Sequence, residues 1–217
     1  VTLYVDPAGK RVLAECFGKA LTPFCTAPNK ATLSVGVAIA HHVVHFATVR
    51  QMAKRAEGMA KVSRNSLAIL LDKRSGGERH VAGSWSPGEG RLALDERLER
   101  WMELIANKLL PHGFIRELER LSLFAEGCRP GKANLEMDAV VLSEVERIMD
   151  RKQADRGKDS PGLDPELRAA VRAELEDSSN GELLSERVRM LAAELTIALE
   201  LGRAIHNPSE PTTGDTE

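Results

Sequence analysis

The sequence predicts an α+β protein, in which a small sheet-and-helix domain precedes a domain made only of helices. Three observations favour this class: two strand-like runs flank an amphipathic segment near the N-terminus, a polar and turn-rich stretch follows, and helical periodicity dominates the rest. We expect four parts, at residues 1–78 (sheet and helices), 79–94 (linker), 95–206 (helical domain) and 207–217 (disordered tail).

The first domain is predicted from four segments. Tyr4–Ala14 has the pattern of a strand–turn–strand hairpin. Ala31–Ala40 combines small and β-branched residues that fit a buried strand. Phe46–Lys61 is rich in Ala, Met, Lys and Arg, with one apolar side, and predicts a helix lying on the sheet. Ser66–Leu71 is a continuous apolar run, which is typical of a strand covered on one or both faces.

The second domain is predicted to be a bundle of helices, because its apolar residues recur every three or four positions. Pro165 stands at the first position of one helix, where its missing N–H costs nothing. The expected helices are Leu94–Leu110, Phe114–Ala125, Leu135–Lys152, one beginning at Asp164-Pro165, and Glu182–Ile205.

Composition narrows the class of protein. The chain has 217 residues, of which 42% are hydrophobic and 4% aromatic, so the core must consist mainly of Leu, Val, Ile and Ala. Three cysteines (Cys16, Cys25 and Cys128) lack the spacing of a metal site, and we expect reduced thiols in a cytoplasmic protein. No run is long and apolar enough to span a bilayer, so we expect no membrane partner.

Charge is distributed unevenly along the chain. Residues 1–94 hold 13 lysines and arginines against 6 acidic residues, a net charge of +7. Residues 95–217 hold 17 against 26, a net charge of −9. The basic part could face a phosphate backbone and the acidic part other partners. Two ordinary domains whose charge differs by chance would give the same numbers.

Three short motifs of the first domain are informative. The first is a serine–small–glycine strand that leads into an Ala-His turn, at Ser34–His41 (SVGVAIAH). The second is a lysine-containing helix end, at Ala60–Asn65 (AKVSRN). The third is a closing turn, at Leu71–Glu78 (LDKRSGGE). They resemble the second half of the palm domain of nucleotidyl cyclases and family-B-like polymerases. Within that superfamily they are most similar to the large subunit of type III CRISPR effector complexes. Leu110–Leu118 and Leu195–Ile205 resemble that family's C-terminal helical domain.

The resemblance implies a partial ferredoxin-like palm whose catalytic motif has degenerated. Related cyclases carry Gly-Gly-Asp-Asp before Val-Leu-Ala, and the two aspartates hold the catalytic divalent metals. Here the sequence before Val12-Leu13-Ala14 places Ala8, Gly9, Lys10 and Arg11 in that turn. Two cations repel Mg²⁺, so we expect no metal site, no catalytic residue and no enzymatic activity in this chain.

A complete palm of this type has a strand and a helix before its hairpin, whereas this sequence starts at the hairpin. A short sheet without them would leave an open edge. We therefore expect the missing half of the palm to come from the same protein or from another polypeptide.

Five residues are candidates for binding a nucleotide or RNA: Lys10, Arg11, Ser34, Lys61 and Arg64. Each has a simpler explanation. Lys10 and Arg11 could form a solvated hairpin tip, Ser34 could be a small residue that permits helix–sheet packing, and Lys61 could be a lysine favoured by the helix dipole.

Two further groups of side chains have more ordinary explanations. The histidines at 41, 42 and 45 straddle a strand-to-helix turn with no carboxylate or thiol nearby, so we expect a polar turn and not a zinc site. Trp85 and Trp101 are expected to anchor the junction between the domains, although an exposed Trp85 would suit an interface.

The resemblance therefore predicts a scaffolding part of a ribonucleoprotein in antiviral defence, without a cofactor. It implies these partners: guide RNA, target RNA, the backbone subunit near the guide's 5′ handle and the helical small subunits. Two alternatives remain. The chain could contribute to a cyclic oligoadenylate synthase using Mg²⁺ and ATP, or it could be a degenerate diguanylate-cyclase-like sensor that binds nucleotide without turnover.

Overall fold

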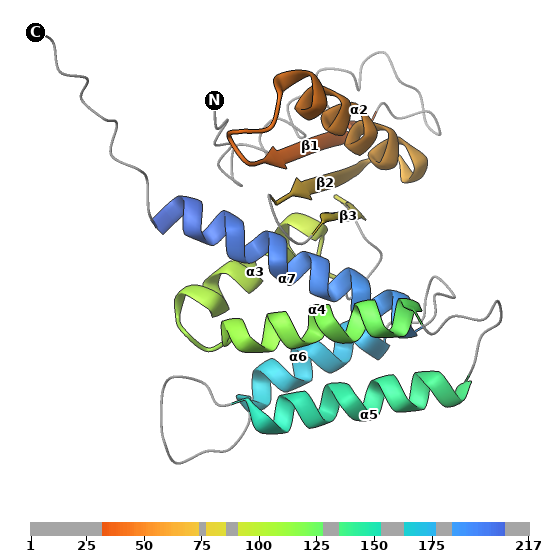
Figure 1. Cartoon of the computed structure of the whole chain (residues 1–217), viewed down its shortest axis with the longest axis vertical. Coiled ribbons are helices and arrows are strands. Elements are labelled where there is room, and N and C mark those ends of the chain that lie inside the picture. The colour runs from red at the N-terminus through yellow and green to blue at the C-terminus, as the bar shows by residue number, and fades with distance from the viewer. Residues whose placement is uncertain are drawn as a thin grey trace, which may run out of the picture. The chain divides into compact units, whose positions relative to one another are not determined.

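The computed structural model of the chain describes residues 32–73, 77–85, 91–127, 135–152, 163–176 and 184–206 (Figure 1). It confirms the α+β class: a three-stranded mixed sheet is accompanied by helices that make up most of the described residues. The chain divides into two compact units, Val1–Glu99 and Arg100–Glu217. No helix among the described residues is both long and apolar enough to cross a membrane.

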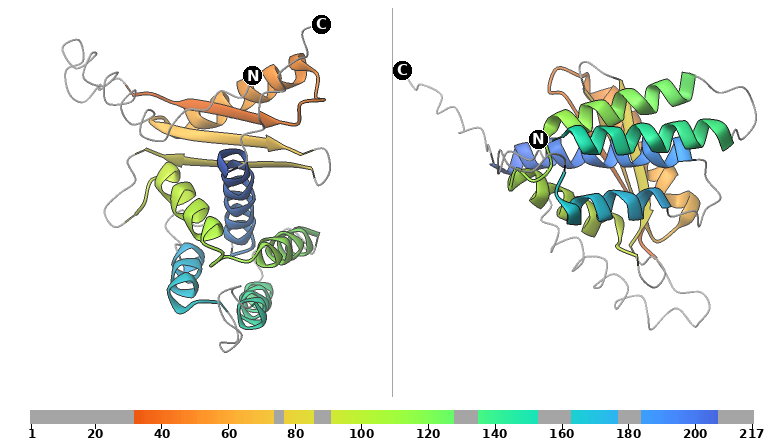
Figure 2. Two further views of the ribbon diagram at one scale, coloured as in Figure 1. Left: turned by 90° about the vertical axis from the view of Figure 1, so that its left-hand side faces the viewer. Right: turned by 90° about the horizontal axis from the view of Figure 1, so that it is seen from below.

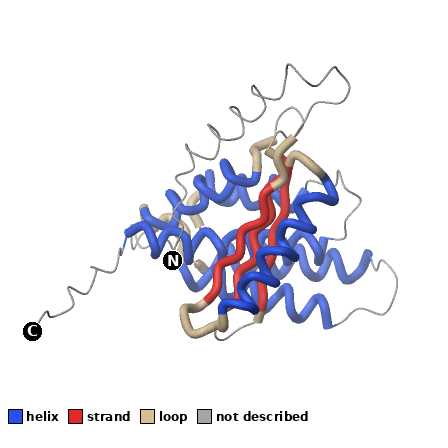
Figure 3. The backbone as a smooth tube through the Cα atoms, turned by 90° about the horizontal axis from the view of Figure 1, so that it is seen from above, coloured by secondary structure: helices blue, strands red, loops and turns tan. Residues whose placement is uncertain are grey.

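The first unit contains a parallel strand–helix–strand motif extended by a hairpin (Figures 2 and 3). Its elements are β1 (Val35–Ala40), α2 (Phe46–Ser63), β2 (Ser66–Asp72) and β3 (Glu78–Ser84). The strand order is β1-β2-β3, with β1 parallel and β3 antiparallel to β2. The predicted strands at 31–40 and 66–71 and the helix at 46–61 correspond to β1, β2 and α2, although Ala31 lies outside the described residues.

Gly36 sets the distance between α2 and the sheet. A Cβ atom on this residue would lie 2.0 Å from the Glu57 backbone nitrogen and 2.5 Å from the Ala56 carbonyl carbon. The helix backbone therefore rests directly on β1, which only glycine permits. Met52, Ala56 and Leu70 form the buried core of this contact, and the side chains of Ala38 and Ala40 pack against it.

The continuous apolar run of β2 is buried on both faces, as its sequence predicts. Leu70 faces α2, whereas Leu67 and Ile69 point to the other face because side chains alternate along a strand. On that face a Cβ at Gly83 would lie 2.9 Å from the Leu94 Cβ, so β3 and the first turn of the next helix approach closely.

The prediction of a linker over residues 79–94 is wrong for its first part. Glu78–Ser84 forms β3, which pairs along its length with β2. Only Val81 of this strand is fully buried. Gly83 and the polar residues interrupt the apolar pattern by which a strand is usually identified in a sequence. The apolar partner strand, and not local sequence preference, drives the pairing. The first compact unit consequently extends past residue 78, to Glu99.

The second unit is all helical. Helix α3 (Leu94–Ala106) passes from the first unit into the second, and α4 (His112–Gly127), α5 (Leu135–Arg151), α6 (Pro165–Glu176) and α7 (Leu184–His206) follow. Helix α4 contacts α5 and α7, and α7 also contacts α5 and α6. Most of its buried side chains are apolar, among them Phe114, Leu118, Val145, Met149, Val171, Val188 and Leu195, and Ser122, Ser185, Glu194 and Thr196 are buried as well.

Two helix ends show which sequence signals are reliable. Asp164 Oδ1 accepts hydrogen bonds from the Glu166 and Leu167 backbone nitrogens at 2.9 and 3.4 Å, which confirms the predicted start with Pro165 at the first helical position. By contrast, α3 ends at Ala106 and not at the predicted Leu110. Lys108, with φ 57°, occupies a left-handed position that usually holds glycine, so the sequence contains no stop signal there.

One acidic side chain connects α4 to the end of α5. Glu117 lies 2.6 Å from the Arg151 guanidinium and 2.7 Å from the Lys152 ammonium. The hydrogen bond from Lys152 and the nearby cations hold the pKa of Glu117 below its usual value, against the opposing effect of burial. The side chains of Glu117 and Lys152 are about three-quarters buried, whereas Arg151 is half exposed, so solvent screens the pair with Lys152 less than a typical surface pair.

Replacing Gly36 tests the close contact between α2 and β1. The Gly36→Ala variant must push α2 away from the sheet, and we expect it to lower the free energy of unfolding by about 2–3 kcal/mol. Urea unfolding followed by circular dichroism measures the change. The control is Gly58→Ala on the same helix, where no described atom lies within 4 Å of the added methyl group. Equal stability of the two variants would contradict the steric role of Gly36.

The Glu117 pairs predict a pH dependence. Because the folded state lowers the pKa of Glu117, its contribution is present above the unfolded-state value of 4.5 and is lost as pH falls through the folded-state pKa. We expect Glu117→Gln to cost about 1 kcal/mol at pH 7 and progressively less below pH 4.5. The control is Glu103→Gln on α3, because Glu103 is exposed and its side chain forms no hydrogen bond or ion pair among the described residues. A pH-independent difference between wild type and Glu117→Gln would refute this role.

Candidate nucleic-acid interface

The topology of the first unit brings three of the five candidate residues to one edge of the sheet. Because β1 and β2 are parallel and joined by α2, both strands begin where the helix ends. Ser34 precedes β1, Lys61 lies in the last turn of α2, and Arg64 follows that helix. Lys10 and Arg11, together with Ala8 and Gly9 of the expected metal-binding turn, lie outside the described residues.

The turn at this edge has an unusual backbone. Arg64 has φ 51° and ψ 165°, and Asn65 has φ 44°. Non-glycine residues adopt such conformations rarely, and each costs roughly 1–3 kcal/mol. Hydrogen bonds hold the turn in place: the Asn65 carbonyl accepts from the Trp85 backbone nitrogen at 3.0 Å and from Ser84 Oγ at 3.3 Å. The exposed side chain of Arg64 consequently extends from a backbone that these hydrogen bonds hold in place.

Trp85 forms two hydrogen bonds at the same edge of the sheet. Its indole Nε1 donates a hydrogen bond to the Leu33 carbonyl at 3.0 Å, next to Ser34, while its backbone nitrogen donates to Asn65. Trp85 therefore joins the beginnings of β1 and β2 within the first unit. Ser34 itself is half-buried, which is compatible with the packing role as well as with ligand contact.

Lys61 is partly neutralised by its own helix. Its ammonium group lies 2.5 Å from Glu57, one turn earlier, and both side chains are well exposed. The hydrogen bond from Lys61 and its charge lower the pKa of Glu57. As an isolated residue, Lys61 therefore fits the helix-dipole explanation, because a cation in the last turn of a helix is favourable.

The outer face of α2 carries two cations that were missing from the predicted set. Arg50 and Lys54 are exposed, and neither forms a hydrogen bond or ion pair within the described residues. Their spacing of four, with Lys61 seven residues further on, places all three on one side of the helix. That spacing is visible in the sequence and could have identified them. Residues 32–73 contain six lysines and arginines against two acidic residues.

The histidines form the polar turn before α2. His45 is the N-cap, and its Nδ1 accepts a hydrogen bond from the Ala47 backbone nitrogen at 3.2 Å. His41 Nδ1 accepts from the Val43 backbone nitrogen at 3.3 Å. Both imidazoles thereby bind donors near the start of the helix. Within the ranges that the structure describes, no three His, Cys, Asp or Glu side chains are close enough together to hold a metal ion.

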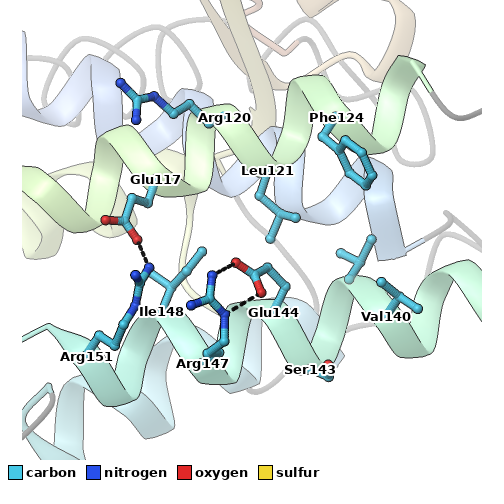
Figure 4. Close-up of a pocket in the computed structure, with 11 residues that line it drawn as sticks. Glu117, Arg120, Leu121, Phe124, Val140, Ser143, Glu144, Arg147, Ile148 and Arg151 are labelled. Atoms are coloured by element: carbon cyan, nitrogen blue, oxygen red, sulfur yellow. Dashed lines mark hydrogen bonds and ion pairs between the residues drawn. The ribbon is translucent and has the colours of Figure 1, made fainter.

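A groove of about 550 Å³ lies between α4 and α5 in the second unit (Figure 4). Its floor is apolar, with Phe124 and Val140 more than half exposed. Glu144 binds Arg147 and Glu117 binds Arg151, so most of the charges at its rim compensate one another (Figure 4). None of the predicted site residues lines it.

No family model, curated protein or solved structure matches the chain. The side chains at the sheet edge and on α2 are therefore the basis for a functional proposal.

The strained backbone conformation of Arg64 leads to a prediction about the stability of the protein. In Arg64→Gly the backbone adopts φ 51° without strain, and we expect the free energy of unfolding to rise by about 1 kcal/mol. Arg64→Ala is the matched control, because alanine removes the charge but keeps the strain. Thermal unfolding of both variants measures the effect. Equal melting temperatures for the two would show that the turn stores no strain.

Proposed function

We propose that this chain is a structural, RNA-contacting part of the large subunit of a type III CRISPR ribonucleoprotein effector, without cyclase activity. In this proposal the first unit is the second half of a ferredoxin-like palm. The second unit is the C-terminal helical domain that docks neighbouring subunits in the cytoplasm.

The observation that carries this proposal is that parts of two of the three resembling motifs meet at one edge of the sheet. Ser34, at the start of one motif, and the Lys61–Asn65 end of another come from segments about 30 residues apart, yet the parallel pairing of β1 and β2 brings them together. Arg64 is exposed there and forms no ion pair with any described residue. A cation held on a rigid turn suits a phosphate group, with which it can form charge-assisted hydrogen bonds.

Chemistry favours binding over catalysis in this proposal. A nucleotide phosphate usually lies at the N-terminus of a helix, where backbone N–H groups and the dipole attract it. Lys61 and Arg64 lie at the opposite end of α2, where only their side-chain charges attract an anion. The turn that holds the metals in related cyclases corresponds here to a segment with Lys10 and Arg11 in place of carboxylates. Contact with an RNA backbone needs neither metal nor helix N-terminus.

Purification of the protein from its natural host tests this proposal. We expect the protein to co-purify with several other subunits and with a uniform set of short guide RNAs, which sequencing of the bound RNA would identify. Addition of ATP, Mg²⁺ and a target RNA that matches the guide should yield no cyclic oligoadenylate from this site. A protein recovered alone and without RNA would overturn the assembly proposal, and product formation would overturn the inactive site.

A further inference from the structure

We propose that the outer face of α2 binds the sugar–phosphate backbone of single-stranded RNA through Arg50, Lys54, Lys61 and Arg64, here called the α2 ridge, with Phe46 as a stacking platform. This inference rests on the proposed function for the presence of RNA. It goes further by assigning the contact to a surface that includes three residues outside the predicted set: Phe46, Arg50 and Lys54.

The ridge lies on the side of α2 that faces away from the sheet. Met52, Ala56 and Ala60 are the buried residues of the helix. At 3.6 residues per turn, positions 50, 54 and 61 fall within an arc of about 40° on the opposite side. From Arg50 to Lys61 the ridge runs about 16 Å along the helix axis, the length of several stacked nucleotides at about 3.4 Å each.

Three of the four cations of the ridge are available for a ligand, and the fourth, Lys61, is paired with Glu57. Arg50, Lys54 and Arg64 have no ion-pair partner in the part of the chain that the structure describes. Glu57 is the one acidic residue of α2, and it binds Lys61. The outer face of the helix therefore carries a net positive charge, and Glu57 is the one carboxylate of α2 that competes with a ligand for these cations. Such a face suits a polyanion.

Phe46 favours a single-stranded nucleic acid over an acidic protein surface. Its side chain is 79% exposed at the first position of α2, one turn before Arg50. An exposed aromatic ring next to a row of cations is the combination that single-strand binders use, because bases stack on the ring while the cations follow the phosphates. Duplex nucleic acid keeps its bases stacked inside and would leave Phe46 without a role.

Gly58 provides an independent indication of a ligand. It lies in the middle of α2, between Lys54 and Lys61, and no described atom is within 4 Å of the position where its Cβ would be. Glycine there destabilises the helix relative to alanine. In contrast to Gly36, nothing in the described structure requires it. Glycine does permit the backbone of a ligand to approach closely, which is what a strand lying along the ridge would do.

Fluorescence anisotropy with a labelled, unstructured single-stranded RNA tests the ridge in the purified assembly. We expect Arg50→Glu/Lys54→Glu to weaken binding at least about tenfold and to reduce the slope of log K against log salt by about 1.4, or 0.7 for each lost phosphate contact. The matched control is Arg116→Glu/Arg120→Glu on α4. These two arginines are also exposed, four apart and without ion pairs among the described residues, so the control makes the same change in net charge.

Two single variants test the remaining parts of the surface. Phe46→Ala should weaken RNA binding about tenfold, whereas Phe46→Trp should preserve it, because stacking needs an aromatic face. Gly58→Ala should raise the melting temperature of the protein and yet weaken RNA binding. A merely structural glycine would not produce these opposite effects.

The outcomes separate this inference from the proposed function. Absence of RNA from the wild-type assembly overturns both. Normal binding by the ridge variant, or equal losses in ridge and control variants, overturns the ridge and leaves the RNA-contacting function intact. Loss of a protein subunit from the ridge variant at unchanged RNA affinity identifies the surface as a protein interface and also overturns the inference. Circular dichroism and thermal unfolding establish that each variant remains folded.

Discussion

The contact between α2 and β1 at Gly36 is the constraint on which the first unit depends. With the Glu57 backbone nitrogen only 2.0 Å from where a Cβ would be, the helix backbone packs against β1 with no room for a side chain at residue 36. The small residues Ala56 and Ala60 on its inner side maintain this close packing. Fixing the inner side also fixes the outer side, and so it determines where Arg50 and Lys54 point.

Both units contain paired and unpaired cations among the described residues. In the second unit several arginines are paired with acids of the same or a neighbouring helix, such as Arg147 with Glu144 and Arg172 with Glu146. The pairing raises the pKa of both arginines and lowers that of their partners, and these charges contribute mainly to the helical packing. On α2, Arg55 pairs with Glu78 and Lys61 with Glu57, whereas Arg50 and Lys54 form no ion pair among the described residues. The net charge of each half was visible in the sequence, but pairing required the structure.

What the sequence could predict follows from how local each signal is. The apolar run of β2, the amphipathic α2 and the Asp164 cap are local patterns, and the structure contains all three. Strand β3 was missed because its pairing depends on β2, and the end of α3 was missed because Lys108 replaces the usual glycine. Ser34 and Arg64 belong to motifs of the resemblance, but their gathering at one edge required the structure, and Arg50 and Lys54 belong to no recognised motif.

Three features of the first unit reduce the stability of the isolated protein and lie on or next to its basic surface. Arg64 adopts a conformation suited to glycine, Gly58 stands where alanine would be better, and Phe46 exposes an aromatic ring to water. Natural sequences tend to violate the rules of stability where function requires it. Their location beside unpaired cations is therefore better explained by a ligand than by packing, and a flexible polyanion with stacking bases would make use of all three.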